Sequence, residues 1–180
     1  MKRFEIKQIL EALLFVSEKP LSLKELKGII KGDYAGIDTN SLENILNELK
    51  EEYVNLNKPY EIKFIADGWV FATKPKYAPW IGKLLKEKRV LKLSPSALET
   101  LAIVAYKQPI TRAEIDDVRG VESSSVIDGL LEKKMIKIIG KKETLGKPVL
   151  YVTTQDFLKC FGLARLSELP SIENISESLQ

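Results

Sequence analysis

The amino-acid sequence predicts a mainly α fold with small β-hairpins (α+β), arranged as two similar domains in tandem. Three observations predict it: a short motif occurs twice, amphipathic helical patterns flank both copies, and each copy then changes to the alternation of a strand. Of the 180 residues, 44% are hydrophobic and 29% are charged, as in ordinary folded proteins. At this length, each of two domains can bury a usable core.

The repeated motif combines a proline with a helix-capping signal. It occurs as KPLSLKEL at 19–26 and as QPITRAEI at 108–115. Pro20 lies 89 positions before Pro109, and each proline disfavours helical geometry in the residue before it. The capping boxes are Ser22 with Glu25 and Thr111 with Glu114. Each copy therefore predicts a helix, a tight turn and a second helix.

Helical spacing of apolar residues predicts further helices on both sides of each copy. The first helices are expected over 6–17 and 98–106, and the third helices over 40–53 and 126–131. Ser94 is placed to start the helix over 98–106, with Pro95 at its first helical position. Gly120 is placed to end the helix that follows the second motif copy.

Each copy then changes to the two-residue period of strands. Apolar residues of 60–64 alternate with Glu61 and Lys63, and Asp67-Gly68 predicts a two-residue hairpin turn into 69–73. In the second copy, strands are expected at 136–139 and 149–153 around a longer polar turn. Short helices are expected after the two hairpins, near 80–86 and 156–163. Three helices followed by a β-hairpin is the winged-helix arrangement.

The chain is thus predicted to hold two tandem winged-helix domains. They are expected over 1–86 and 94–166, with a linker over 87–93 and a flexible tail over 167–180. The charge is nearly balanced, with 28 Lys and Arg against 25 Asp and Glu. No run approaches the ~18 apolar residues of a membrane span, and one cysteine fits a reducing compartment. We expect a cytoplasmic protein with no membrane contact.

The sequence offers no catalytic or metal-binding constellation. It has no histidine, the commonest general base and metal ligand, and Cys160 is its only cysteine. We expect Cys160 to be a small apolar residue of a helix. Residues 140–148 have five residues between their glycines and no hydroxyl after the lysine, so they do not form a phosphate-binding loop. We therefore expect no catalytic residue, no metal site and no cofactor.

Many winged-helix domains bind DNA through their third helix, but both third helices here are acidic. The first contains four glutamates and one lysine, and the second carries Glu122, Asp128 and Glu132. Carboxylates repel the phosphate backbone that supplies most of the binding free energy. The hairpin segment 133–147 differs, because it contains six lysines and one glutamate. These lysines either keep an exposed hairpin in solution or make a weak, non-specific contact with DNA.

Apolar side chains also exceed what small domains need for their cores. Trp69, Phe71 and Trp80 cluster in and after the first hairpin, and such aromatic residues are favoured at protein interfaces. Core packing is the alternative for each of them. The stretch 101–106 is apolar on all sides, which is more than one covered helix face requires.

Two stretches of the second half have a distinctive sequence, LSPSALETLAIVAYKQPITRAEIDDVRGV (93–121) and GKKETLGKPVLYVTTQDFLKCFGLARLSELP (140–170). They resemble the bacterial segregation and condensation protein B family, and EALLFVSEKPLS in the first half matches that family more loosely. The resemblance implies a non-catalytic adaptor of a bacterial condensin, in which two copies bind one kleisin subunit. That kleisin bridges the heads of the SMC ATPase, so the contact with the ATPase is indirect. The resemblance also implies a homodimer formed through the first domain and a role in chromosome condensation and segregation.

We expect the kleisin to dock as an amphipathic helix on the second domain. The residues expected to edge the groove are Tyr106, Arg112, Arg119 and Tyr151, while Trp69, Phe71 and Trp80 are expected at the dimer interface. Association with the nucleoid follows from the same resemblance. The alternative function is a winged-helix DNA-binding transcriptional regulator, which the fold and the lysine-rich hairpin favour.

Overall fold

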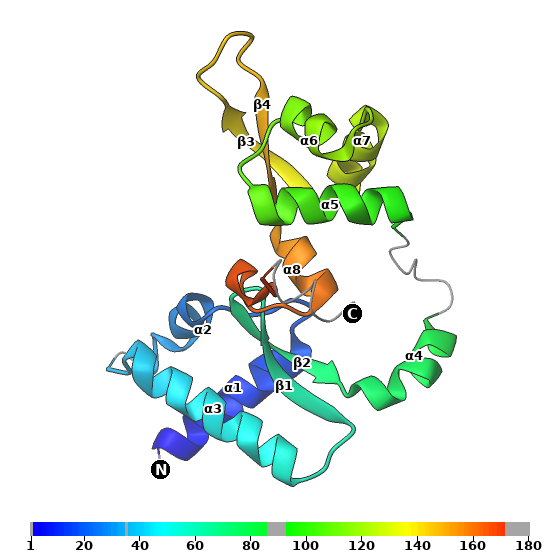
Figure 1. Cartoon of the computed structure of the whole chain (residues 1–180). Helices are drawn as coiled ribbons and strands as arrows, with labels where there is room; N and C mark the ends of the chain where they lie inside the picture. Colours follow the sequence, from blue (N-terminus) through cyan, green and yellow to red (C-terminus); the bar gives the residue numbers. More distant parts are fainter. Residues whose placement is uncertain (1, 35, 86–92, 172–180) are drawn as a thin grey trace. The chain divides into compact units, whose positions relative to one another are not determined.

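The computed structural model describes residues 2–34, 36–85 and 93–171, which form two compact units, Met1–Lys88 and Arg89–Gln180 (Figure 1). The predicted linker lies outside the described residues except for Leu93, and so do residues 172–180 of the predicted tail. Each unit has three helices, then an antiparallel two-stranded hairpin, then a short helix. The predicted α+β class with two winged helices is confirmed.

The described residues of the first unit form seven elements. They are α1 (Lys2–Val16), α2 (Leu23–Ile30), α3 (Thr39–Asn55), β1 (Tyr60–Ile65), β2 (Gly68–Thr73), the 3-10 helix η1 (Pro75–Tyr77) and α4 (Ala78–Leu84). The apolar faces of α1, α2 and α3 pack together into one core, in which Leu10, Leu26 and Leu46 are fully buried. The Ser22 capping box begins α2 as predicted, with Glu25 bonded to the hydroxyl and to the backbone of Ser22.

The turn of the first hairpin lies one residue before its predicted place. Strand β1 pairs with β2 so that Ile65 faces Gly68, which leaves Ala66 and Asp67 as the turn, with φ of 52° and 57°. Gly68 is therefore the first residue of a strand, and the turn prediction was wrong. The reason for a glycine here is space, because a Cβ would lie 2.8 Å from the Pro20 Cβ and 2.9 Å from the Pro20 carbonyl carbon.

A third, one-residue strand completes the first hairpin. The Leu21 N–H donates to the Trp69 carbonyl over 2.9 Å, and the Trp69 N–H donates to the Leu21 carbonyl over 2.8 Å. This bridge ties the proline-containing turn before α2 to strand β2. It also places the Trp69 ring in the core, where it is 3% exposed.

The second unit repeats this plan. Its elements are α5 (Pro95–Lys107), α6 (Arg112–Arg119), α7 (Ser124–Glu132), β3 (Ile136–Lys141), β4 (Val149–Thr153), α8 (Gln155–Phe161) and η2 (Leu166–Glu168). Ser94 caps α5 and Pro95 is its first residue, as predicted. Thr111 and Glu114 form the second capping box, and Gly120 ends α6 at a φ of 70°, which favours glycine.

The bridge to the hairpin recurs at equivalent positions. The Tyr151 N–H donates to the Ile110 carbonyl over 2.8 Å, and the Ile110 N–H donates back over 3.2 Å. Ile110 lies 89 residues after Leu21, the same offset as the sequence repeat. The Gln108 amide oxygen also accepts from the backbone N–H of Thr153 at 2.7 Å. The repeat therefore encodes the closure of each hairpin onto its own helices.

Candidate functional site

Helix α5 leaves an apolar stripe outside the core of the second unit. Leu101 and Val104 are buried, but Leu98 is 45% exposed, Ala102 is exposed and Tyr106 is half-buried. Residues four apart share one helix face, so Leu98, Ala102 and Tyr106 form a continuous line along α5. The predicted excess of apolar surface on this helix is present in the structure.

The stripe ends at a groove between α5 and the segment that contains η2. The groove is lined by Ala105, Tyr106, Leu166, Ser167, Leu169 and Pro170. The Tyr106 hydroxyl donates to the Pro170 carbonyl over 2.7 Å, and the Glu168 carboxylate accepts from the Ala164 N–H at 2.7 Å. Residues 166–170, which include the start of the predicted flexible tail, are thus bonded to their own unit.

Two of the four residues predicted to edge a groove have little exposed side chain. Tyr151 is 7% exposed, because the bridge to Ile110 turns its strand into the unit, and burial raises its pKa. The Arg119 side chain is also 7% exposed. Its guanidinium donates to the hydroxyls of Ser96 at 2.8 Å and Ser123 at 3.2 Å. These contacts fasten α6 to α5 and to the start of α7, so placing Tyr151 and Arg119 at an open groove edge was wrong.

The remaining two predicted residues do not share a groove. Arg112 is exposed at the start of α6, and its guanidinium donates to the Ser124 hydroxyl over 3.1 Å at the start of α7. Tyr106 is the one member of the predicted set that lines the apolar groove beside η2. Leu166 and Leu169 were missed in the sequence, although they are three positions apart, because residues 167–180 were expected to form a flexible tail.

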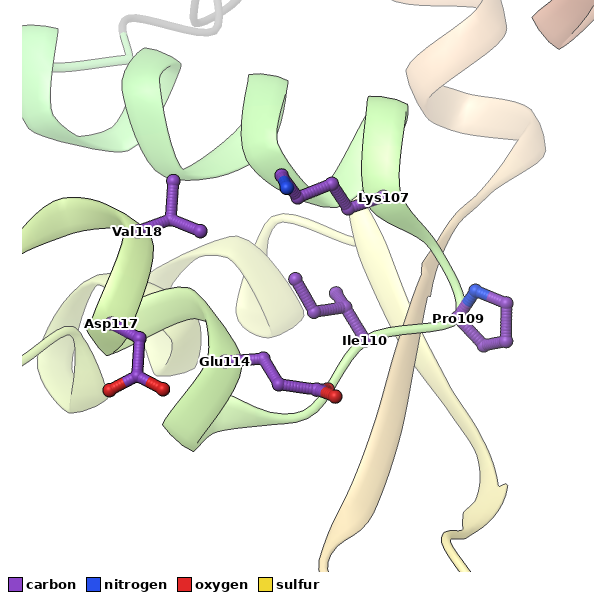
Figure 2. Close-up of a pocket in the computed structure, with 6 residues that line it drawn as sticks. All are labelled: Lys107, Pro109, Ile110, Glu114, Asp117 and Val118. Atoms are coloured by element: carbon purple, nitrogen blue, oxygen red, sulfur yellow. The ribbon is translucent and has the colours of Figure 1, made fainter.

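A second hollow, of about 460 Å³, lies between the end of α5 and helix α6 (Figure 2). Its lining residues are Lys107, Pro109, Ile110, Glu114, Asp117 and Val118. Glu114 is held by Lys142 over 2.6 Å and by Thr111, and these contacts lower the pKa of its carboxyl to about 2. The lining of the hollow is thus mixed, with three charged and three apolar residues. Its carboxylate at Glu114 is already committed to the capping box and to the hairpin.

The exposed surface of α7 is acidic. Glu122, Asp128 and Glu132 are all exposed on or beside this helix. This is the position that would enter the major groove in a winged helix that recognises bases, and three carboxylates there oppose a phosphate backbone.

The first unit presents an aromatic cluster formed by Phe15, Tyr53, Tyr60 and Phe71. Ring centroids lie 5.0 Å apart for Tyr53 and Phe71, 5.8 Å for Tyr60 and Phe71, and 6.5 Å for Phe15 and Phe71. Phe15 is 82% exposed, and Tyr60 is 37% exposed. Burial and the acceptor Glu11 raise the pKa of the Tyr53 hydroxyl, which stays protonated as a donor. The cluster is an uncovered apolar surface.

The three residues predicted at a dimer interface are placed differently from one another. Phe71 belongs to the aromatic cluster, and Trp80 is 65% exposed on α4. Trp69 is in the core and does not reach the surface, so its assignment to an interface was wrong. The sequence did contain a signal for Phe15, since it follows the buried Leu14 directly and so points away from the core stripe of α1.

The described residues can also be searched for metal-binding clusters, free thiols and membrane-spanning helices. Within them, no group of three or more His, Cys, Asp or Glu side chains could hold a metal ion. Cys160 lies in helix α8, as expected, and is exposed. No helix in the described part of the chain is long and apolar enough to cross a bilayer.

Two winged-helix units, each with apolar surface outside its core, define a protein of the partner-binding class. The family model described as segregation and condensation complex subunit ScpB matches residues 8–172, which include both units. The chain belongs to this family.

Curated relatives support the family along nearly the whole chain. Segregation and condensation protein B of Clostridioides difficile is 41% identical over 98% of this chain and 97% of its own length. That of Syntrophotalea carbinolica is 40% identical over 98% of this chain and 87% of its own. Among solved structures, ScpB of Mycobacterium tuberculosis is 32% identical over 91% of this chain and 98% of its own, with a TM-score of 0.42.

Proposed function

We propose that this chain is the non-enzymatic, kleisin-binding adaptor of a bacterial SMC condensin, acting in chromosome condensation and segregation. The observation that carries the proposal is the family match, which runs through both winged-helix units and not through one generic domain. ATP hydrolysis then belongs to the SMC ATPase, which this chain contacts indirectly through the kleisin. The place of action is the cytoplasm, at the nucleoid.

A transcriptional regulator with the same fold is the less favoured function. It would need a third helix that admits the DNA backbone, and α7 carries exposed carboxylates instead. The two relatives above, which are matched over 87% and 97% of their own length, are also both named segregation and condensation protein B.

For the kleisin, we propose the stripe on α5 and the groove beside η2. Leu98 and Ala102 offer a flat apolar line, and Tyr106 supplies an aromatic ring at its end, next to Leu169. An amphipathic partner helix buries such a line through residues at every third or fourth position. The Tyr106 hydroxyl is already bonded to Pro170, so the ring offers its apolar area to the partner.

The test is calorimetry of the kleisin with the full chain and with single variants. Truncation of a central aromatic anchor costs about 2 kcal/mol, or roughly thirtyfold in affinity, so Tyr106→Ala should weaken binding to that extent. Tyr106→Phe keeps the ring and should bind nearly as well as the parent. The matched control is Ile139→Ser, which removes a 53% exposed apolar side chain from β3. A loss below threefold for Tyr106→Ala, with folding intact by circular dichroism, would place the docking surface elsewhere.

For self-association, we propose the aromatic cluster of the first unit. Phe15 and Phe71 are in edge contact and Phe15 is largely uncovered, so a second copy can bury both rings. Light scattering should report a dimer for the parent chain and a monomer for Phe15→Ser at micromolar concentration. Ile29→Ser, which changes an exposed apolar residue of α2, should remain dimeric. A dimeric Phe15→Ser variant would remove the cluster from the interface.

A further inference from the structure

The hairpin of the second unit carries a positive surface that the adaptor role does not use. The segment 133–147 contains six lysines and one glutamate. Lys142 pairs with Glu114 on α6 over 2.6 Å. In the described part of the chain, no carboxylate lies within ion-pair distance of the other five, Lys133, Lys134, Lys137, Lys141 and Lys147. All five are exposed, so their charge is uncompensated.

The hairpin holds these lysines on an ordered framework. Strands β3 and β4 pair from Ile136 opposite Thr153 to Lys141 opposite Val149. In the turn, the Lys142 N–H donates to the Pro148 carbonyl over 2.8 Å, and the Lys147 N–H donates to the Thr144 carbonyl over 2.9 Å. The turn projects beyond α6 and away from the helices of its own unit (Figure 1). The pair between Lys142 and Glu114 braces the side of the hairpin against α6.

The tip of the hairpin carries one uncovered apolar side chain. Leu145 is fully exposed, at 104%, with Lys141 and Lys147 close by in sequence. A leucine at such a tip gains no burial in this chain alone. Apolar side chains at the tips of DNA-binding elements insert into the minor groove between bases, while neighbouring cations hold the phosphates.

We propose that this hairpin is a contact for the phosphate backbone of duplex DNA, without base recognition. The segment 133–147 contains no Trp, Tyr, Phe or Arg, the residues that dominate protein interfaces, and lysine is depleted there. It also contains no Asn, Gln or Arg to recognise base edges. Lysine is a mobile point charge that suits phosphates in any sequence.

The dimensions and the surroundings fit this partner. A six-residue strand is ~20 Å long, so lysines along the hairpin can reach the phosphates on both sides of a minor groove that is about 6 Å wide. The acidic α7 keeps the duplex off the third helix and leaves the hairpin as the contact. DNA would thus be held at the hairpin while the α5 stripe stays available to a protein partner.

The test is fluorescence anisotropy of a labelled duplex with the full-length chain at 50–200 mM salt. Non-specific binding with a Kd of about 10⁻⁴ M or tighter is expected. The affinity should fall with salt with a logarithmic slope of about −4, since each neutralised phosphate contributes ~0.9. The triple variant Lys137→Ser, Lys141→Ser, Lys147→Ser should bind roughly tenfold or more weakly, and the magnitude of its logarithmic salt slope should be smaller by about 3. Two unrelated duplex sequences should bind equally.

The matched control removes three exposed lysines from the first unit, as Lys24→Ser, Lys31→Ser and Lys58→Ser, and it has the same net charge as the hairpin variant. It should bind DNA like the parent. Equal losses in both variants, or no binding by the parent at 50 mM salt, would overturn the proposal. So would lysine-dependent binding to phosphatidylglycerol vesicles that is tighter than binding to DNA. The hairpin variant should bind the kleisin normally, which separates this proposal from the adaptor function.

Discussion

Replacement of Gly68 by alanine should uncouple the first hairpin from its helices. The new Cβ would lie 2.8 Å from the Pro20 Cβ and 2.9 Å from the Pro20 carbonyl carbon, and the latter is a backbone atom that cannot rotate away. Relief of this overlap requires Trp69 and Leu21 to separate, which stretches two hydrogen bonds of 2.8 and 2.9 Å. Overpacking costs about 1–3 kcal/mol and each hydrogen bond contributes about 1 kcal/mol. Because the separation relieves part of the clash, we expect the free energy of unfolding of the first unit to fall by about 2–3 kcal/mol.

The measurement can be confined to the first unit, because Trp69 and Trp80 are the only two tryptophans of the chain and both lie there. Urea unfolding followed by tryptophan fluorescence should therefore report this unit alone. With a slope of about 1–2 kcal/mol per molar urea, the midpoint should fall by roughly 1–3 M. Gly28→Ala is the matched control: Gly28 lies inside α2 with open space around it, so this change should stabilise the unit by about 0.5–1 kcal/mol. An unchanged midpoint for Gly68→Ala would refute the steric argument.

Three further changes test other contacts. Ala66→Gly should raise the stability of the first unit by about 0.5–1 kcal/mol, because Ala66 has a φ of 52°; the same fluorescence assay reports it, and a destabilised variant would contradict the reasoning. Arg119→Ala should destabilise the second unit by about 2–3 kcal/mol, measured by thermal unfolding followed by circular dichroism. Arg119→Lys should be only partly destabilised, since a lysine cannot reach Ser96 and Ser123 together. Full stability of Arg119→Ala would refute the fastening role. The pKa of Glu114 is lowered to about 2, so its carboxylate contributes stability that is present above about pH 4.5 and is lost as pH falls toward 2. Glu114→Gln should therefore be less stable than the parent at pH 7, and the difference should shrink below pH 4.5. A difference in stability that does not depend on pH would argue against this linkage.

Local chemistry in the sequence accounts for most of the helical framework. The capping boxes at Ser22 and Thr111, the start at Ser94 and the end at Gly120 were predictable because each depends on residues within four positions. The hairpin turn was misplaced because Gly68 serves a contact with Pro20, 48 positions away, and not a positive φ. Sequence periodicity carries no information about such an approach.

The candidate site was less predictable for the same reason. Trp69 and Tyr151 were expected at surfaces because they are aromatic residues on hairpins. Both are buried by one-residue bridges to Leu21 and Ile110, which are invisible as strands in the sequence. Phe15 was overlooked, because the apolar residues of the helix expected over 6–17 were not sorted into those on its core face and those outside it. Tyr106 lines an apolar groove, and its role with the kleisin stays a prediction.

The bridge between Leu21 and Trp69 also sets the order of events during synthesis on the ribosome. The first unit needs strand β2 before its turn, core and hairpin can close, but it needs no residue of the second unit for that closure. At translation rates of roughly 5–20 residues per second, the remaining ~90 residues take about 5–20 s to appear. The first unit therefore has seconds in which to fold, far longer than most domains of its size need. Nascent chains can present a finished first unit while the second is still being made.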